Sequence, residues 1–217
     1  MATTLQREDV LIGAPALSGE LALPTKPCGL VVFAHGSGSS RASPRNRFVA
    51  GVLHAQLVGT LLFDLLTEAE AAQRANVFDM GLLARRIGQA LDWIAARTDL
   101  AHLPIGLFGA STGAGAALIA AAQRPGEIAA VVSRGGRPDL AGAALPEVRA
   151  PTLLIVGGDD PVVIDLNRQA MRDLRCEVRL EIVPHATHLF EESGTLEAVA
   201  RSAAHWFASH FATAGPQ

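Results

Sequence analysis

The chain has no tyrosine, a single lysine and only two cysteines among its 217 residues. Without tyrosine, a mechanism that needs a phenol as acid, base or oxyanion donor is excluded. Cys28 and Cys176 each precede an expected strand and match neither a disulfide framework nor a metal site, so we expect reduced, structural thiols. Apart from Lys26 the basic residues are scattered arginines. Because they form no continuous stripe, we expect no nucleic-acid partner.

Long apolar runs and clustered charges are also missing. Hydrophobic residues make up 49% of the chain and charged residues 18%, a balance that excludes disorder. No run reaches the roughly 18 to 20 apolar residues that cross a bilayer, so we expect no membrane partner. Glu8 and Asp9 lie where a signal peptide needs a basic start and an apolar segment, which favours a cytoplasmic protein. No linker divides the chain, and we expect one domain over residues 1–217.

Strand and helix patterns alternate after an opening pair of short strands. The opening runs, residues 10–12 and 17–23, are separated by turn formers and favour an antiparallel start. Later runs show little polar alternation, as in strands buried on both faces of a parallel sheet: residues 30–33, 60–63, 105–108, 128–133, 151–156 and 177–183. Helices are expected after Ser111 and near residues 47–58, 76–97, 164–174 and 196–211.

The longest helix pattern covers about residues 76–97. Its apolar side chains recur at three- and four-residue steps and predict the face that packs on the sheet: Phe78, Leu82, Leu83, Ile87, Leu91 and Ile94. The other faces carry polar side chains, namely Arg85, Arg86, Gln89 and Asp92. Trp93 and Trp206 fall in helix patterns, and we expect them in the core or at an interface rather than against a ligand.

Residues 109–113 read Gly-Ala-Ser-Thr-Gly at the point where a strand pattern becomes a helix pattern. G-x-S-x-G in that context predicts a nucleophile elbow, in which a tight turn exposes the serine. The flanking residues must be small because such a turn adopts an unusual backbone conformation and brings chain segments close together. In a chain rich in alanine and glycine the pentapeptide can also be a plain glycine-rich turn. Ser111 is therefore interpreted together with the other loops.

Four loops that follow expected strands carry candidate reactive groups. Reactive groups gather at the carboxyl ends of parallel strands, so these loops should lie together. They are residues 35–40 (His-Gly-Ser-Gly-Ser-Ser), Ser111, residues 157–160 (Gly-Gly-Asp-Asp) and residues 185–188 (His-Ala-Thr-His). Serine, aspartate and histidine thus follow one another in the chain order of an α/β-hydrolase triad.

The triad is assigned to Ser111, Asp160 and His188. A serine hydroxyl is a poor nucleophile until a base takes its proton, and His188 is the predicted base, with Asp160 fixing its tautomer. His185 competes for that role but is better explained as a strand-end histidine with local hydrogen bonds. Asp159 and Asp160 are adjacent and cannot both point inward, so we expect Asp159 to cap a turn or meet solvent.

The developing negative charge of an ester transition state needs preorganised donors. The backbone amides of Thr112, which follows the nucleophile, and Ser37, in the glycine-rich loop, are the expected oxyanion hole. His35 and Gly36 open that loop and are candidate substrate contacts. The alternative interpretation of residues 35–40 is a flexible turn or a phosphate-binding loop, but the G-x-G-x-x-G motif of such loops is absent.

A metal site formed by His185, His188 and Asp160 is disfavoured, because neither H-E-x-x-H nor a set of cysteines is present. We expect no metal and no other cofactor.

Residues 133–139, Ser-Arg-Gly-Gly-Arg-Pro-Asp, follow the strand next in sequence after that of the nucleophile. The guanidinium groups of Arg134 and Arg137 lie near the expected acyl site and could bind a substrate carboxylate at two points. A second interpretation is that they pair with Asp139 or Glu147 and only hold the loop.

Taken together, residues 35–38, 109–113, 157–163 and 185–190 make the chain resemble the α/β-hydrolase superfamily, and more narrowly its small dienelactone-hydrolase-like branch. The resemblance covers nearly the whole chain. It implies a three-layer α/β/α sandwich around an eight-stranded, mostly parallel sheet, with Ser111, Asp160 and His188 as nucleophile, acid and base. Dienelactone hydrolases use cysteine at the elbow, so serine here favours ordinary ester chemistry. The short stretch between Ser133 and Pro151 leaves no room for a large lid.

We therefore expect a cofactor-independent serine hydrolase that cleaves a small-molecule carboxylic ester through an acyl-enzyme. Two other functions stay open. One is an acyltransferase or perhydrolase on the same triad, in which something other than water takes the acyl group. The other is a non-catalytic binding protein that keeps the fold. The natural substrate is left open, and so is the oligomeric state, with a homodimer among the outcomes.

Overall fold

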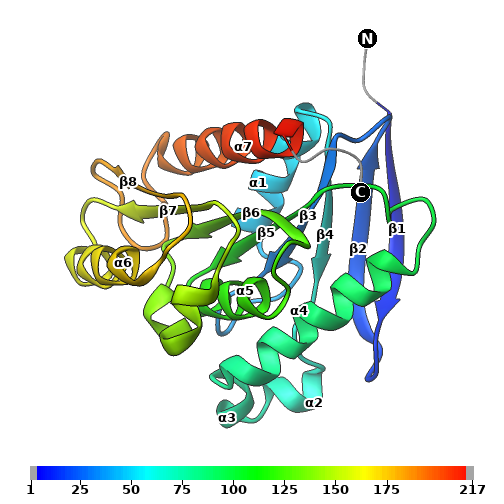
Figure 1. Cartoon of the computed structure of the whole chain (residues 1–217), viewed down its shortest axis with the longest axis horizontal. Helices are drawn as coiled ribbons and strands as arrows, with labels where there is room; N and C mark the ends of the chain where they lie inside the picture. Colours follow the sequence, from blue (N-terminus) through cyan, green and yellow to red (C-terminus); the bar gives the residue numbers. More distant parts are fainter. Residues whose placement is uncertain (1–3, 214–217) are drawn as a thin grey trace.

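The computed structural model describes residues 4–213 and shows one eight-stranded sheet with helices on both faces (Figure 1). In chain order the elements are β1 (Leu5–Ile12), β2 (Leu17–Pro24), β3 (Gly29–Ala34), α1 (Pro44–Ala55), β4 (Val58–Phe63), α2 (Glu68–Ala71), α3 (Arg74–Val77), α4 (Met80–Ala95), β5 (Ile105–Ala110), α5 (Thr112–Gln123), β6 (Ile128–Arg134), the 3₁₀ segment η1 (Pro138–Glu147), β7 (Thr152–Gly157), α6 (Pro161–Asp173), β8 (Val178–Val183) and α7 (Thr195–Thr213). The predicted α/β/α sandwich is confirmed.

The strands are ordered β1-β2-β4-β3-β5-β6-β7-β8 across the sheet. Only β2 runs against its neighbours, because it pairs antiparallel with both β1 and β4, while β3 to β8 pair in parallel. The chain moves outward from β3 to β4 and then crosses back to β5 on the other side of β3. The carboxyl ends of β3 and β5 therefore flank the position where the winding changes direction, which is where open α/β sheets bind ligands.

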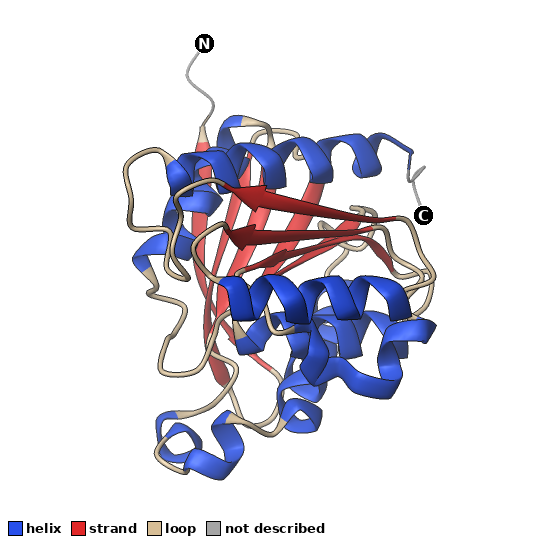
Figure 2. Cartoon of the chain, turned by 90° about the vertical axis from the view of Figure 1, so that its left-hand side faces the viewer, coloured by secondary structure: helices blue, strands red, loops and turns tan. Residues whose placement is uncertain are grey.

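Two apolar clusters hold the three layers together. Helices α1 and α7 cover one face of the sheet, while α4, α5, α6 and η1 lie on the other, as Figures 1 and 2 show. The inner strands β3, β4 and β7 are buried on both faces, as predicted. The prediction was wrong for β8, which lies at the edge of the sheet and keeps partly or fully exposed residues. Burying each large apolar side chain contributes about 1.5–3 kcal/mol. The central strands are thus the rigid base from which the site loops extend.

The long helix differs from the prediction at its start. Asp79 accepts a hydrogen bond from the Leu82 amide at 2.8 Å and begins α4 at Met80, so the residues before it form the separate turn α3. Phe78, predicted to pack on the sheet, lies before this cap and is 48% exposed. Arg86, predicted on a polar face, is buried because the Glu70 carboxylate accepts its Nη2–H at 2.6 Å. Both predictions were wrong.

The burial of the other core residues, tryptophans and cysteines can be compared with the predictions. Leu83, Ile87, Leu91 and Ile94 are buried and Leu82 is partly buried. Trp206 is buried, whereas Trp93 is half-buried beside the Arg97 guanidinium. Cys28 and Cys176 are free thiols, and burial raises the pKa of each. Across residues 4–213, every helix is too short or too polar to cross a bilayer.

Candidate active site

Ser111 lies on a strained turn between β5 and α5. Its φ of 51° and ψ of −122° place a residue with a side chain in a region that normally favours glycine. Neighbouring backbone holds it there: the Ser111 amide donates to the Arg134 carbonyl at 3.2 Å, and the Ser111 carbonyl accepts from the Arg137 amide at 3.0 Å. The strained backbone presents the serine hydroxyl at the end of the strand, as the elbow motif predicts.

The glycines of the elbow are needed because other backbone passes close to them. A Cβ at Gly113 would overlap the carbonyl oxygens of Ala34 and His35, and a Cβ at Gly109 would overlap the backbone of Ala114. The small residues therefore let α5 pack directly against the end of β3 and set the height of Ser111 above the sheet.

His188 and Asp160 form a hydrogen-bonded pair. The imidazole Nδ1–H donates to Asp160 Oδ2 at 2.7 Å. Asp160 is the residue before α6, yet its side chain makes no helix-capping hydrogen bond. A Cβ at Gly135 would lie 3.6 Å from His188 Cε1, so the imidazole sits beside the carboxyl end of β6, the strand next to that of Ser111. With Nδ1 engaged, Nε2 is left to accept a proton.

Ser111 and His188 line one cavity of about 270 Å³ together with Gly36, Ala110 and Arg134. Within residues 4–213, no hydrogen bond joins the Ser111 hydroxyl to the imidazole. Catalytic hydrogen bonds of this kind are often long until substrate is bound. The cavity thus brings the predicted nucleophile and base to one space, with Asp160 behind the base.

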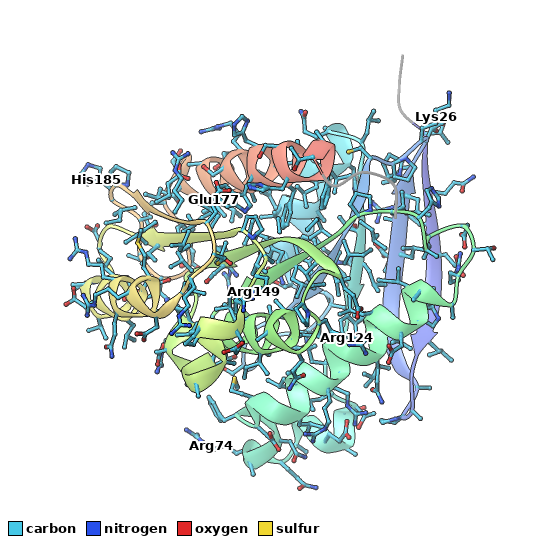
Figure 3. All side chains as sticks on the ribbon, in the orientation of Figure 1. Lys26, Arg74, Arg124, Arg149, Glu177 and His185 are labelled. Carbon is cyan, nitrogen blue, oxygen red and sulfur yellow. The ribbon has the colours of Figure 1, made fainter. Side chains whose placement is uncertain are left out.

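The competing residues lie elsewhere. His185 is exposed and projects from the outer edge of the molecule (Figure 3). Among the described residues it has no hydrogen bond, so the local bonds expected for it do not form. Asp159 is exposed, in line with the prediction that it meets solvent, and its amide donates to the Ala186 carbonyl at 3.0 Å. Asp160 and His188 are the members of these two pairs that the structure brings together.

The glycine-rich loop after β3 lies against Ser111, the predicted nucleophile. A Cβ at Gly36 would lie 3.1 Å from both the Ala110 carbonyl oxygen and Ser111 Cβ, so the loop needs glycine to approach. The Thr112 amide is at the first position of α5 and has no acceptor within the helix. The Ser37 amide, in contrast, donates to Thr112 Oγ1 at 2.9 Å. The prediction for Ser37 is corrected in this respect, because an oxyanion would have to share or replace that acceptor.

His35 supports the loop and also lines a cavity. Its Nε2 accepts from the Leu65 amide at 3.1 Å, and its Nδ1–H donates to the Gly36 carbonyl at 3.0 Å. Burial lowers the pKa of His35, opposed by the Gly36 hydrogen bond and the Asp64 charge. The neutral imidazole therefore ties β3 to the chain after β4. Both ring nitrogens are engaged, but His35 also lines the second cavity of this site, so its contact with substrate stays a prediction.

A second cavity, of about 320 Å³, lies on the other side of this loop and shares Gly36, Ser37 and Ser39 with the first. Its far wall is apolar and is formed by Leu65, Leu66, Val77 and Leu83. This wall was not predicted from the sequence. The available signal was the pair Leu65-Leu66 one residue after β4, followed by the Thr67–Glu70 capping box that starts α2.

The two arginines of the β6 loop have different roles. Arg137 Nε–H and Nη2–H donate to both carboxylate oxygens of Asp139, at 2.8 and 2.7 Å. Its prediction as a substrate contact is corrected, because Asp139 occupies the guanidinium and Arg137 lines neither cavity. Arg134 does line the cavity of Ser111 and is 7% exposed.

No metal-binding cluster is formed by the part of the chain that the structure describes: within residues 4–213, His, Cys, Asp and Glu side chains do not gather in groups of three or more.

Solved structures share this fold over the whole chain. A dienelactone hydrolase from Anabaena variabilis superposes with a TM-score of 0.91 and 53% identity, covering 97% of this chain and 99% of that one. The esterase domain of a Rhodothermus marinus protein superposes with a TM-score of 0.74 at 17% identity, covering 96% of this chain and 99% of that one, and shows likeness of fold alone.

Curated relatives and a family model match as well. Proteins from two strains of Mycobacterium tuberculosis, provisionally named phosphoribosyl transferase, are 58% identical over 207 residues. The match covers 95% of this chain but 47% of theirs, so the chain spans about half the length of these relatives. The model of the dienelactone hydrolase family matches residues 48–213. The fold, the elbow and this match together show that the chain belongs to the dienelactone hydrolase family.

Proposed function

We propose that this protein is a serine hydrolase that cleaves carboxylic esters through an acyl-enzyme. The observation that carries the proposal is the cavity shared by Ser111 and His188, with Asp160 Oδ2 2.7 Å from the far nitrogen of the imidazole. A strained serine, an imidazole and an orienting carboxylate are the parts that this acyl-enzyme chemistry requires.

The chemistry runs in two halves. Ser111 Oγ attacks the ester carbonyl carbon while its proton passes to His188 Nε2, and the Thr112 amide stabilises the oxyanion. The intermediate collapses, the C–O bond to the alcohol breaks, and the alcohol takes the proton from His188. A water molecule then attacks the acyl carbon and gives its proton to His188. When Ser111 leaves it regains that proton, and the carboxylic acid is released.

The neighbouring cavity provides space for the apolar part of a small ester. Its leucine and valine wall starts beyond Ser37 and Thr112, which places it next to the reacting carbonyl. Within residues 4–213, η1 is the one element between β6 and β7, so this connection forms no large lid. We infer acyl or alcohol groups of modest size, because an apolar wall of this kind selects by volume.

The relatives support hydrolysis more directly than transfer. The Anabaena variabilis structure carries the name of a hydrolase and matches over nearly its whole length. The name phosphoribosyl transferase belongs to proteins about twice as long as this chain. A site built around an activated serine is suited to cleaving esters through an acyl-enzyme. We therefore assign hydrolysis to this chain.

The test combines an active-site label with turnover. A fluorophosphonate probe should label the wild type at Ser111, and Ser111→Ala should lose both the label and at least about a thousandfold in kcat on 4-nitrophenyl esters. His188→Ala should lose a similar factor, with His185→Ala as its matched control. An unlabelled wild type, or a Ser111→Ala variant that keeps a tenth of its activity, would refute the proposal.

The choice of acyl acceptor is tested separately. Hydrolysis predicts that the free acid dominates even when a small alcohol or hydrogen peroxide is added. Products that shift mainly to the new ester or to the peracid would identify an acyltransferase or a perhydrolase on the same triad.

A further inference from the structure

Arg134 is a buried guanidinium without an acidic partner. It ends β6, the strand beside that of Ser111, and is 7% exposed. Its guanidinium carbon lies 5.9 Å from the centre of the Phe190 ring. Its Nε is buried and has no hydrogen bond, and among the described residues no carboxylate forms an ion pair with it. Burying a charge in this way is costly unless something pairs with it.

Arg86 is another buried arginine, but its guanidinium has hydrogen-bond partners. Its exposed fraction is the same, 7%, but Glu70 Oε1 accepts from its Nη2 at 2.6 Å and the Ala14 carbonyl from its Nη1 at 3.1 Å. Arg137 likewise has Asp139. Arg134 differs from both because it lines the cavity of Ser111 and forms no ion pair with a carboxylate among the described residues.

A second arginine adds positive charge to the same cavity. Arg45, in the first turn of α1, lines it, and its Nε is also buried without a partner. Its Nη1 is 3.3 Å from Glu191 Oε1, but that carboxylate is 64% exposed and compensates it only weakly. Burial, and then repulsion from Arg45, lower the pKa of Arg134 to about 10, so Arg134 stays charged at neutral pH.

Arg134 and Arg45 line the same cavity, so their guanidinium groups provide several N–H donors at one site. Donors of this kind match a carboxylate or phosphate, which accepts two parallel hydrogen bonds from a guanidinium.

We propose that Arg134 and Arg45 bind an anionic group of the substrate, a carboxylate or a phosphate, inside the cavity that holds Ser111 and His188. This inference rests on the proposed ester hydrolysis, because the bound anion would place the scissile carbonyl at Ser111. The proposed pair differs from the pair Arg134 and Arg137 expected from the sequence. Arg45, which is far from Arg134 in the chain, takes the place of Arg137.

Binding is measured first on the Ser111→Ala protein, which needs no turnover. Titration calorimetry with inorganic phosphate and with succinate should show binding of at least one of them, and the tighter one identifies the favoured anion. Adding Arg134→Met or Arg45→Met should weaken that binding at least about tenfold, since each removes a charge-assisted hydrogen bond. Arg137→Met is the matched control and should leave the affinity unchanged.

Turnover is measured next, on otherwise unmodified protein. The ratio of kcat/KM for mono-4-nitrophenyl succinate to that for the neutral 4-nitrophenyl pentanoate should exceed one. Arg134→Met should reduce this ratio at least about tenfold, while Arg137→Met should not change it. If Arg134→Met fails to fold, the same ratio is measured for Arg45→Met and should fall by a similar factor. The Arg45 side chain is 34% exposed, so its replacement should leave the fold intact.

The outcomes separate this inference from the proposed function. If Ser111→Ala protein binds neither anion, or if the Arg134 and Arg137 variants weaken binding equally, the anion site is refuted while ester hydrolysis stands. If anions bind through Arg134 and Arg45 but no ester is cleaved and no probe labels Ser111, the site stands and the proposed hydrolysis fails.

Discussion

Asp160 accepts the Nδ1–H of His188 at 2.7 Å from the position before α6, where an aspartate ordinarily caps the helix. The carboxylate serves the imidazole and leaves the first amides of α6 without a side-chain cap. A residue type that is common at helix starts therefore holds an imidazole here. Because Asp160 does not cap α6, its replacement should affect the imidazole without removing a hydrogen bond from the helix.

Asp160→Asn should lower kcat for ester hydrolysis at least about a hundredfold, because an amide cannot hold the imidazole in the tautomer that accepts the serine proton. Stability should change little, since asparagine is also a good residue at a helix start. Asp159→Asn, one residue away and exposed, is the control. Steady-state kinetics and thermal unfolding of both variants check this, and equal loss in both would leave the acid unassigned.

Thr112→Val should lower kcat by about tenfold, because it removes the hydroxyl that holds the Ser37 amide at 2.9 Å next to the nucleophile. Thr112 is buried, and valine has a similar shape, so the fold should survive. Thr112→Ser keeps the hydroxyl and should keep most of the activity. A rise in kcat for the valine variant would mean that the hydroxyl competes with the oxyanion for the Ser37 amide.

Gly113→Ala should destabilise the protein by about 1–3 kcal/mol or more, because its Cβ would overlap the carbonyl oxygens of Ala34 and His35. Gly51→Ala is the matched control, since nothing lies within 4 Å of a Cβ there. Gly51 is inside α1, so Gly51→Ala should raise the free energy of unfolding by about 0.5–1 kcal/mol. Urea unfolding of both variants measures the difference, and a neutral Gly113→Ala would show that β3 and α5 can separate.

Stability should fall as the pH drops from about 6.5 toward 4. Burial, and then the nearby Arg7 charge, lower the pKa of His54 to about 4, while Glu20 opposes the shift. The folded state therefore keeps His54 neutral where the unfolded chain binds a proton, so acid favours unfolding across this window. The His54 imidazole also bonds Thr60 Oγ1 at 2.8 Å.

The check is urea unfolding at several pH values between 7.5 and 4. His54→Gln should reduce the pH dependence, leaving the part due to His35, whose pKa burial also lowers. If the wild type and His54→Gln lose stability with equal slope, His54 is protonated in the folded protein and the prediction is wrong.

Much of the site was predictable because its signals are local. The elbow is recognisable from Gly109 to Gly113, since a strained turn tolerates only small neighbours. Strands buried on both faces appear as continuous apolar runs. Parallel strands place their carboxyl ends together, so the chain order Ser111, Asp160, His188 was enough to expect a pair such as the one that Asp160 and His188 form.

Other features depended on which segments meet in space. Phe78 follows the helical period but is exposed because the Asp79 cap starts a new helix after it. Arg86 is buried because Glu70, from another helix, faces it. The role of Ser37 also changed, because the Thr112 hydroxyl accepts its amide.

Sequence alone was enough to expect the alternation of strands and helices and the serine, aspartate and histidine that follow β5, β7 and β8, because periodicity and turn chemistry act over a few residues. The pairing of charges, in contrast, depended on the tertiary structure. Arg137 and Arg134 look alike in Ser-Arg-Gly-Gly-Arg, yet one meets Asp139 and the other meets Arg45 across the Ser111 cavity. The free energy of a charge depends on its burial and on its neighbours in space, which packing alone brings together.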